Sequence, residues 1–202
     1  MKTLLIILGL TVSVLTQGIS VADLQAKMKA KKLKDVKIFY DKFKDRTSIQ
    51  TDREDIVGQG EKIAIGLVDS VAATSGVRQT GLPLILYMSV GIGFKGEALL
   101  ESPQTFRLVF HSLTDSWMLN LGDQKIYILF DGERLEISPS PLEVRGPIPY
   151  STVLEYEIAK ESLEKIIAAK SAELKLGDTA PRKWKTNISR RAKTLIDLTE
   201  IN

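Results

Sequence analysis

The sequence predicts a mainly β protein of the α+β class, an antiparallel β-sandwich or partly open barrel with two C-terminal helices. Three observations support this prediction. Apolar and polar residues alternate with a period of two through much of the segment 36–158, which is typical of half-buried strands. A helical period appears only after that segment, within 161–199. Strands that run together before any helix argue against an alternating, parallel α/β sheet.

The composition limits the classes of function. The chain has 202 residues, 44% hydrophobic and 26% charged, which suits one globular domain with a sizeable core. It has no cysteine, so disulfides, thiolate zinc sites and cysteine nucleophiles are excluded. Its single histidine, His111, excludes a multi-histidine metal site. The net charge of +3 is too small to indicate a nucleic-acid partner, and no motif predicts a cofactor.

Residues 1–22 are typical of a signal peptide. Lys2 precedes the apolar run 4–15, and a more polar stretch with small residues follows. Ser20-Val21-Ala22 fits the small-x-small rule best, which predicts a cut before Asp23. Thr16-Gln17-Gly18 is the second choice, with a cut before Ile19. We therefore expect an exported protein, periplasmic or extracellular.

The alternative is a retained membrane anchor. Residues 4–22 carry no charge, and their length is nearly enough to span a bilayer. A lysine cluster follows them, whereas only Lys2 precedes them, and the positive-inside rule favours keeping such a cluster in the cytoplasm. A membrane-anchored protein is therefore the second expectation for location.

Residues 23–35 are predicted to be a basic linker, and residues 36–202 a single β-rich domain. The segment 23–46 carries eight lysines and one arginine against four aspartates, an excess of five positive charges. This segment is either an arm that touches an anionic polymer or lipid, or a solvated linker or helix that joins the leader to the folded body. The interleaved aspartates Asp35, Asp41 and Asp45 favour the linker.

Six segments carry the alternation expected of strands. They are 36–43, 61–69, 82–94, 105–112, 125–138 and 153–158. Within 82–94, Gly91 and Gly93 predict a bulge or bend that curves the sheet. The proline-rich stretch 138–149 predicts an exposed connection, because proline cannot donate to a central ladder.

Asp131-Gly132 predicts a two-residue hairpin turn with positive φ at both central residues. With Phe130 opposite Glu133, the apolar residues of both strands fall on one face. A shift of one residue would destroy this agreement, so the turn and the apolar pattern predict the same register.

Two helices are predicted at the C-terminal end. The first covers 161–175, with Leu163, Ile166, Ile167 and Leu174 on one stripe and Gly177 just past its end. The second covers 189–199, with Ser189 or Asn187 as the N-cap.

Few residue patterns point to chemistry. Gly91 to Gly96 (GIGFKG) matches a dinucleotide fingerprint in form, but no helix is predicted after its last glycine, so we expect no nucleotide site. Any serine hydrolase mechanism would have to use His111, which alternation places with Arg107 and Val109 on the face opposite the core. Four scattered acids are candidates for hydrolytic carboxylates or calcium ligands, but their spacing matches neither kind of site: Asp115, Asp123, Asp131 and Glu133.

The sequence therefore predicts no specific catalytic, cofactor or metal residue. Our leading hypothesis is a non-enzymatic binding or structural module of the cell envelope or extracellular space. Its partner would be an envelope protein or an anionic polymer. The alternatives are a secreted hydrolase that uses carboxylates or His111, and a membrane-anchored protein.

Overall fold

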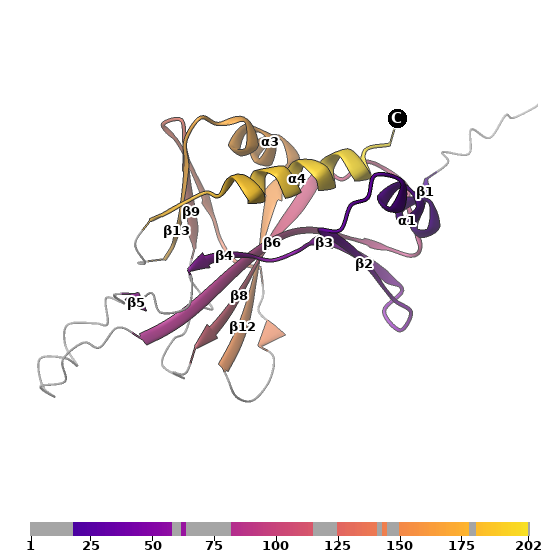
Figure 1. Ribbon diagram of the computed structural model, residues 1–202. Coiled ribbons are helices and arrows are strands. Elements are labelled where there is room, and N and C mark those ends of the chain that lie inside the picture. The colour runs from indigo at the N-terminus through magenta and orange to yellow at the C-terminus, as the bar shows by residue number, and fades with distance from the viewer. Residues whose placement is uncertain are drawn as a thin grey trace, which may run out of the picture.

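The computed structural model describes residues 18–57, 62–63, 82–114, 125–140, 143–144, 150–177 and 181–201. Antiparallel strands dominate these residues, and helices α3 and α4 follow near the C-terminus (Figure 1). The predicted fold class is confirmed. The leader segment 4–15, most of the predicted strand 61–69, and the acids Asp115 and Asp123 lie outside the described residues.

The larger sheet has the strand order β11-β12-β8-β6-β3-β2, and β4 and β5 also pair with β6. In the described part of the chain, β11 and β2 are opposite edges, so the sheet is open rather than a closed barrel. Its strands are β2 (Val36–Asp41), β3 (Arg46–Thr51), β4 (Glu54–Val57), β5 (Lys62–Ile63), β6 (Leu82–Lys95), β8 (Thr105–Thr114), β11 (Glu143–Val144) and β12 (Tyr150–Ala159).

A smaller antiparallel sheet has the order β10-β9-β13-β14, and β1 pairs with β7 apart from both. These strands are β1 (Ile19–Ser20), β7 (Ala98–Leu99), β9 (Ile126–Phe130), β10 (Glu133–Ile137), β13 (Ala172–Leu176) and β14 (Arg182–Lys183). The helices are α1 (Val21–Ala30), α3 (Lys160–Ala168) and α4 (Thr186–Thr199).

The hydrophobic core lies against one face of the larger sheet. Alternate residues of β8 point into it, and Phe106, Leu108 and Phe110 are each at most 1% exposed, as the alternation predicted. The smaller sheet, α3 and α4 contribute to the same apolar cluster. Phe110 meets Tyr156 edge to face, with ring centroids 5.5 Å apart. Burial raises the pKa of the Tyr156 phenol far above its usual value.

The predicted Asp131-Gly132 hairpin is confirmed. Both turn residues have positive φ, 45° at Asp131 and 89° at Gly132. Phe130 pairs with Glu133, and the register continues to Ile126 opposite Ile137. The turn chemistry and the apolar alternation agree, which is why this local prediction succeeds.

The two C-terminal helices differ in extent from their predictions. Helix α3 ends at Ala168, and Leu174, predicted on its apolar stripe, instead lies in β13 opposite Ile128 of β9. Pairing with β9 outweighs local helix propensity there. Helix α4 begins at Thr186 after Lys185, which makes no side-chain cap. The predicted caps, Ser189 and Asn187, are wrong, because both residues lie inside the helix; the Ser189 hydroxyl instead accepts a hydrogen bond from the Trp184 indole over 3.0 Å.

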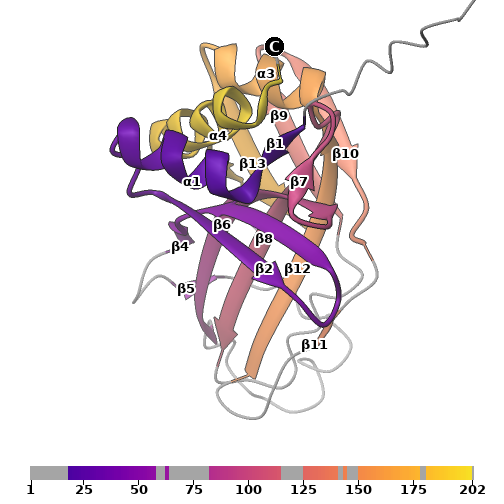
Figure 2. The same cartoon turned by 90° about the vertical axis from the view of Figure 1, so that its right-hand side faces the viewer.

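The segment 23–35, expected to be a linker or joining helix, contains most of helix α1. Ser20 is its N-cap and forms a capping box with Asp23, whose pKa the Ser20 hydroxyl lowers. Leu24 is fully buried in the common core. Figure 2 shows α1 above β2, close to α4. The first turns of α1 are therefore part of the packed body.

Candidate functional site

The face of the larger sheet that points away from the core forms a cavity of about 470 Å³. Strands β3, β6, β8 and β12, the end of β2 and the β2–β3 turn supply its lining. The lining side chains of polar or charged type are Asp41, Lys44, Arg46, Ser48, Gln50, Arg107, His111 and Glu155. Such a volume is large enough to hold a small organic ligand.

The curvature of the sheet makes this face concave. Figure 2 shows β2 crossing in front of β6, β8 and β12 rather than running beside them. Strand β6 connects the two parts of the sheet: its residues 84–91 pair with β8, and its residues 91–95 pair with β3. At the crossing point, a Cβ on Gly91 would stand 3.0 Å from the Ile49 carbonyl oxygen. Glycine therefore permits the close approach of β3. The predicted bulge does not form at Gly91 or Gly93, because β6 keeps its register with β3 and β8 there.

Two arginines converge at a second glycine of β6. Arg46 on β3 pairs with Lys95, and Arg107 on β8 pairs with Gly91, so the two arginines flank Gly93 from opposite sides. A Cβ on Gly93 would stand 3.1 Å from both Nε and Nη2 of Arg46, and it would collide with Nη2 of Arg107. The missing side chain leaves the space that the two guanidinium groups share.

The charges in this cavity are only partly balanced. Arg107 Nη1 lies 2.9 Å from Glu155 Oε2, and the Arg107 side chain is 18% exposed. Asp41 Oδ1 accepts hydrogen bonds from the backbone N–H groups of Phe43 and Lys44. Among the residues that the structure describes, no carboxylate forms an ion pair with Arg46. One guanidinium is therefore left for a negatively charged partner.

The floor of the cavity is buried: Val109 lines it, and Ser89, which pairs with Val109, lies next to the lining residues. Ser89 is 2% exposed, and its hydroxyl accepts a hydrogen bond from Gln50 Nε2 over 2.5 Å. Val109 beside it is 6% exposed. The combination of a buried floor and a charged rim is typical of a ligand site, where a few polar groups orient the ligand.

His111 lines this cavity, on the same face as Arg107 and Val109, as the alternation predicted. It is half-buried and lies opposite Val153 of β12. Glu155, the nearest lining acid along β12, is occupied by Arg107. The structure brings His111 into a cavity, which its position in the sequence did not predict.

The two candidate hydrolytic acids that the structure describes, Asp131 and Glu133, do not lie near His111. Asp131 and Glu133 lie at the hairpin between β9 and β10, in the smaller sheet. The Asp131 carboxylate accepts hydrogen bonds from the backbone N–H groups of Ser171 and Lys170, both over 3.1 Å. These bonds lower the pKa of Asp131. Its role is to fasten the α3–β13 connection to the hairpin.

The glycine motif 91–96 does not form a nucleotide site of the fingerprint type. Residues 91–95 are the end of strand β6, and Gly96 lies in a turn with φ of 75°. Strand β7 follows this turn, so the helix N-terminus that would bind a pyrophosphate is absent at this described position.

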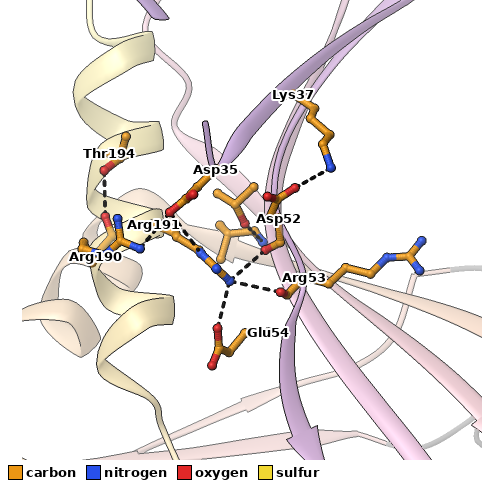
Figure 3. Close-up of polar contacts among 10 residues, drawn as sticks. Asp35, Lys37, Asp52, Arg53, Glu54, Arg190, Arg191 and Thr194 are labelled. Atoms are coloured by element: carbon orange, nitrogen blue, oxygen red, sulfur yellow. Dashed lines mark hydrogen bonds and ion pairs between the residues drawn. The ribbon is translucent and has the colours of Figure 1, made fainter. Parts of the chain in front are cut away.

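A second cluster of charges ties α4 to the larger sheet (Figure 3). Arg191 Nη1 lies 2.9 Å from Glu54 Oε2, and it also donates to the backbone carbonyls of Asp52 and Arg53. Arg190 Nη2 lies 2.8 Å from Asp35 Oδ2, and this hydrogen bond is the main reason for the lowered pKa of Asp35. Since carboxylates and carbonyls already engage these two arginines, we assign the cluster a structural role.

Within the described ranges, no group of three or more His, Asp or Glu side chains is placed to hold a metal ion. None of the helices that the structure describes combines the length and apolar character required to cross a membrane.

Comparisons of the chain with protein-family models, with curated proteins and with solved structures found no match.

Proposed function

We propose that this protein is an exported, non-enzymatic binding module of the cell envelope or extracellular space, and that its ligand occupies the concave cavity of the larger sheet. The observation that carries this proposal is the cavity of about 470 Å³ with a buried floor and a charged rim. Its polar lining is not needed for the hydrophobic core, which packs against the opposite face. Hydrogen-bond donors gathered at a concave surface are suited to hold a polar ligand.

Binding at this cavity is tested by filling it. Ser48 is a half-buried lining residue, and Ser48→Trp would place an indole in the ligand space. Ser138→Trp is the matched control, because Ser138 is exposed after β10 and does not line the cavity. We expect the wild type and Ser138→Trp to retain the same ligand from the native envelope, and Ser48→Trp to lose it. Equal retention by all three proteins would contradict the proposal.

The export part of the proposal includes the place of the cut. A cut before Asp23 would remove Ile19 and Ser20, and with them the β1–β7 pairing and the N-cap of α1. A cut before Ile19, the second choice of the sequence rule, leaves both features intact. Loss of an N-cap of this type costs about 1 kcal/mol. We therefore infer that the mature chain begins at Ile19.

Sequencing of the mature N-terminus tests this inference. Signal peptidase needs a small residue directly before the cut. Ala22→Leu would therefore block a cut before Asp23 and leave a cut before Ile19 unchanged, while Gly18→Leu would do the opposite. Ile19 as the first residue in both the wild type and Ala22→Leu is the expected result. Asp23 as the first residue would contradict the inferred cut, and an intact Met1 would support the membrane-anchored alternative.

A secreted hydrolase is the second candidate function. The supporting observation is that His111 lies in the same cavity as Glu155 and Ser48. The pairing of Glu155 with Arg107 disfavours a catalytic role for that acid, because a triad acid orients the histidine. The two functions are separated by His111→Ala and a panel of esters: a loss of hydrolysis would favour the enzyme.

A further inference from the structure

We infer that the arginine pair at Gly93, formed by Arg46 and Arg107, binds an oxyanion group of a small organic ligand, a carboxylate or a phosphate. This inference rests on the proposed function and names the chemistry of its ligand. Three features support it: the place of the two guanidinium groups, the balance of charge, and the size of the cavity.

The two guanidinium groups come together because of the strand register. β3 and β8 border opposite sides of β6, and Arg46 and Arg107 lie diagonally across Gly93 on one face. Both groups reach the position that a Cβ of Gly93 would occupy. Two positive groups that lie close together repel each other; Glu155 beside Arg107 offsets part of this repulsion, and a bound anion would offset the rest.

The local charge favours an anion. Glu155 neutralises Arg107, and in the described part of the chain Arg46 has no such partner. The lining keeps a small positive excess, because Lys44 and the two arginines outnumber the two carboxylates, Glu155 and Asp41, and Asp41 pairs across the strands with Arg46. Guanidinium groups bind carboxylate and phosphate through paired hydrogen bonds, which makes arginine the preferred residue for such ligands.

The size of the cavity indicates that the anion is part of a larger molecule. A volume of about 470 Å³ exceeds what an inorganic ion fills. Gln50 and Ser48 offer neutral polar groups beside the arginine pair. We therefore expect a ligand that presents one anionic group to Arg46 and Arg107 and a polar body to the rest of the cavity.

The first experiment uses inorganic phosphate and acetate as probes, because the ligand itself is not identified. Titration of the purified protein is followed by NMR, through the Gly93 amide and the Nε–H signals of the two arginines. We expect phosphate or acetate to shift these three signals in a saturable manner. Arg46→Gln and Arg107→Gln should each weaken binding about tenfold, as the loss of one charged hydrogen bond does.

Two further variants separate a built site from general attraction of anions. Arg134→Gln removes the same charge from the smaller sheet, where Arg134 stacks on Tyr127, and it should leave binding unchanged. Gly93→Ala keeps the net charge and displaces the end of Arg107, a flexible side chain that can shift at little cost. It should weaken binding several-fold with no change in fold.

Two results would overturn the inference. One is an equal loss of binding in Arg134→Gln and Arg46→Gln, which would mean that only net charge matters. The other is a Gly93 signal that neither probe shifts. The proposed function is tested separately: if Ser48→Trp loses the native ligand while the arginine variants keep it, the cavity binds a ligand without an oxyanion at Gly93.

Discussion

Leu24→Ala tests whether helix α1 belongs to the folded body or is a basic linker. Leu24 is fully buried, in a helix that contacts α4 and β2. The substitution removes three carbon atoms, which corresponds to about 2.4 kcal/mol at about 0.8 kcal/mol per buried methylene. The cavity that remains adds to this, so we expect the free energy of unfolding to fall by about 3–4 kcal/mol.

The assay is urea unfolding of the purified protein, followed by tryptophan fluorescence, to which Trp184, 5% exposed in the same core, contributes. Gln25→Ala is the matched control, because Gln25 is the exposed neighbour on the same helix, and it should change stability by less than about 0.5 kcal/mol. An effect of Leu24→Ala as small as that of the control would refute the docking of α1. A small loss with a lower denaturant slope would mean that α1 detaches alone, which also contradicts our reasoning.

Three further predictions concern the Glu54–Arg191 contact, the hydrogen bonds of Asp131 and the turn residue Gly132. Glu54→Gln weakens the contact with Arg191 and should lower the free energy of unfolding by about 1–2 kcal/mol in the same urea assay; no change would mean that the cluster of Figure 3 is not structural. The pKa of Asp131 is lowered, so its carboxylate stabilises the fold above the unfolded pKa of about 3.9, and this contribution is lost as the pH falls further. As the pH falls below about 4, the free energy of unfolding should therefore decrease less for Asp131→Asn than for the wild type. An equal decrease in both proteins would contradict this role of Asp131. Gly132→Ala should destabilise by about 1–2 kcal/mol, because φ is 89° at this position, and an unchanged melting temperature would contradict the strained turn.

The strands that the sequence predicted best are those in which local signals agree. β8 places Phe106, Leu108 and Phe110 on the core face and Arg107, Val109 and His111 on the other, and the Asp131-Gly132 turn sets the register of its own hairpin. Each signal involves residues that are close in the chain, so no knowledge of the fold is needed to interpret it.

Strand β3 was missed because its buried positions are not all apolar. Thr47 and Thr51 are buried with Ile49 between them, so the apolar alternation is weak. Their hydroxyl groups are satisfied by distant residues: Thr47 donates to the Gly96 carbonyl, and Thr51 accepts from the Val90 amide. Buried polar side chains need such partners, and these partners are supplied only when β6 pairs with β3.

The candidate site was beyond the reach of the sequence for a related reason. Arg46, Gly93 and Arg107 lie in three different strands, and no motif in the sequence links them. They meet because β6 pairs with β3 at one end and with β8 at the other. The pair of glycines in β6 was the one signal for this site in the sequence. It predicted a bulge or bend, but not that two arginines would meet there.

The amino-acid sequence by itself determined the class of fold, the central hairpin and the face on which His111 lies, since these follow from side-chain alternation and turn chemistry over a few residues. Only the tertiary structure decided where α3 ends, that α1 packs into the core, and that two arginines share the space above one glycine. Those features depend on which segments pair or pack together and in which register, and such contacts join residues that are far apart in the sequence.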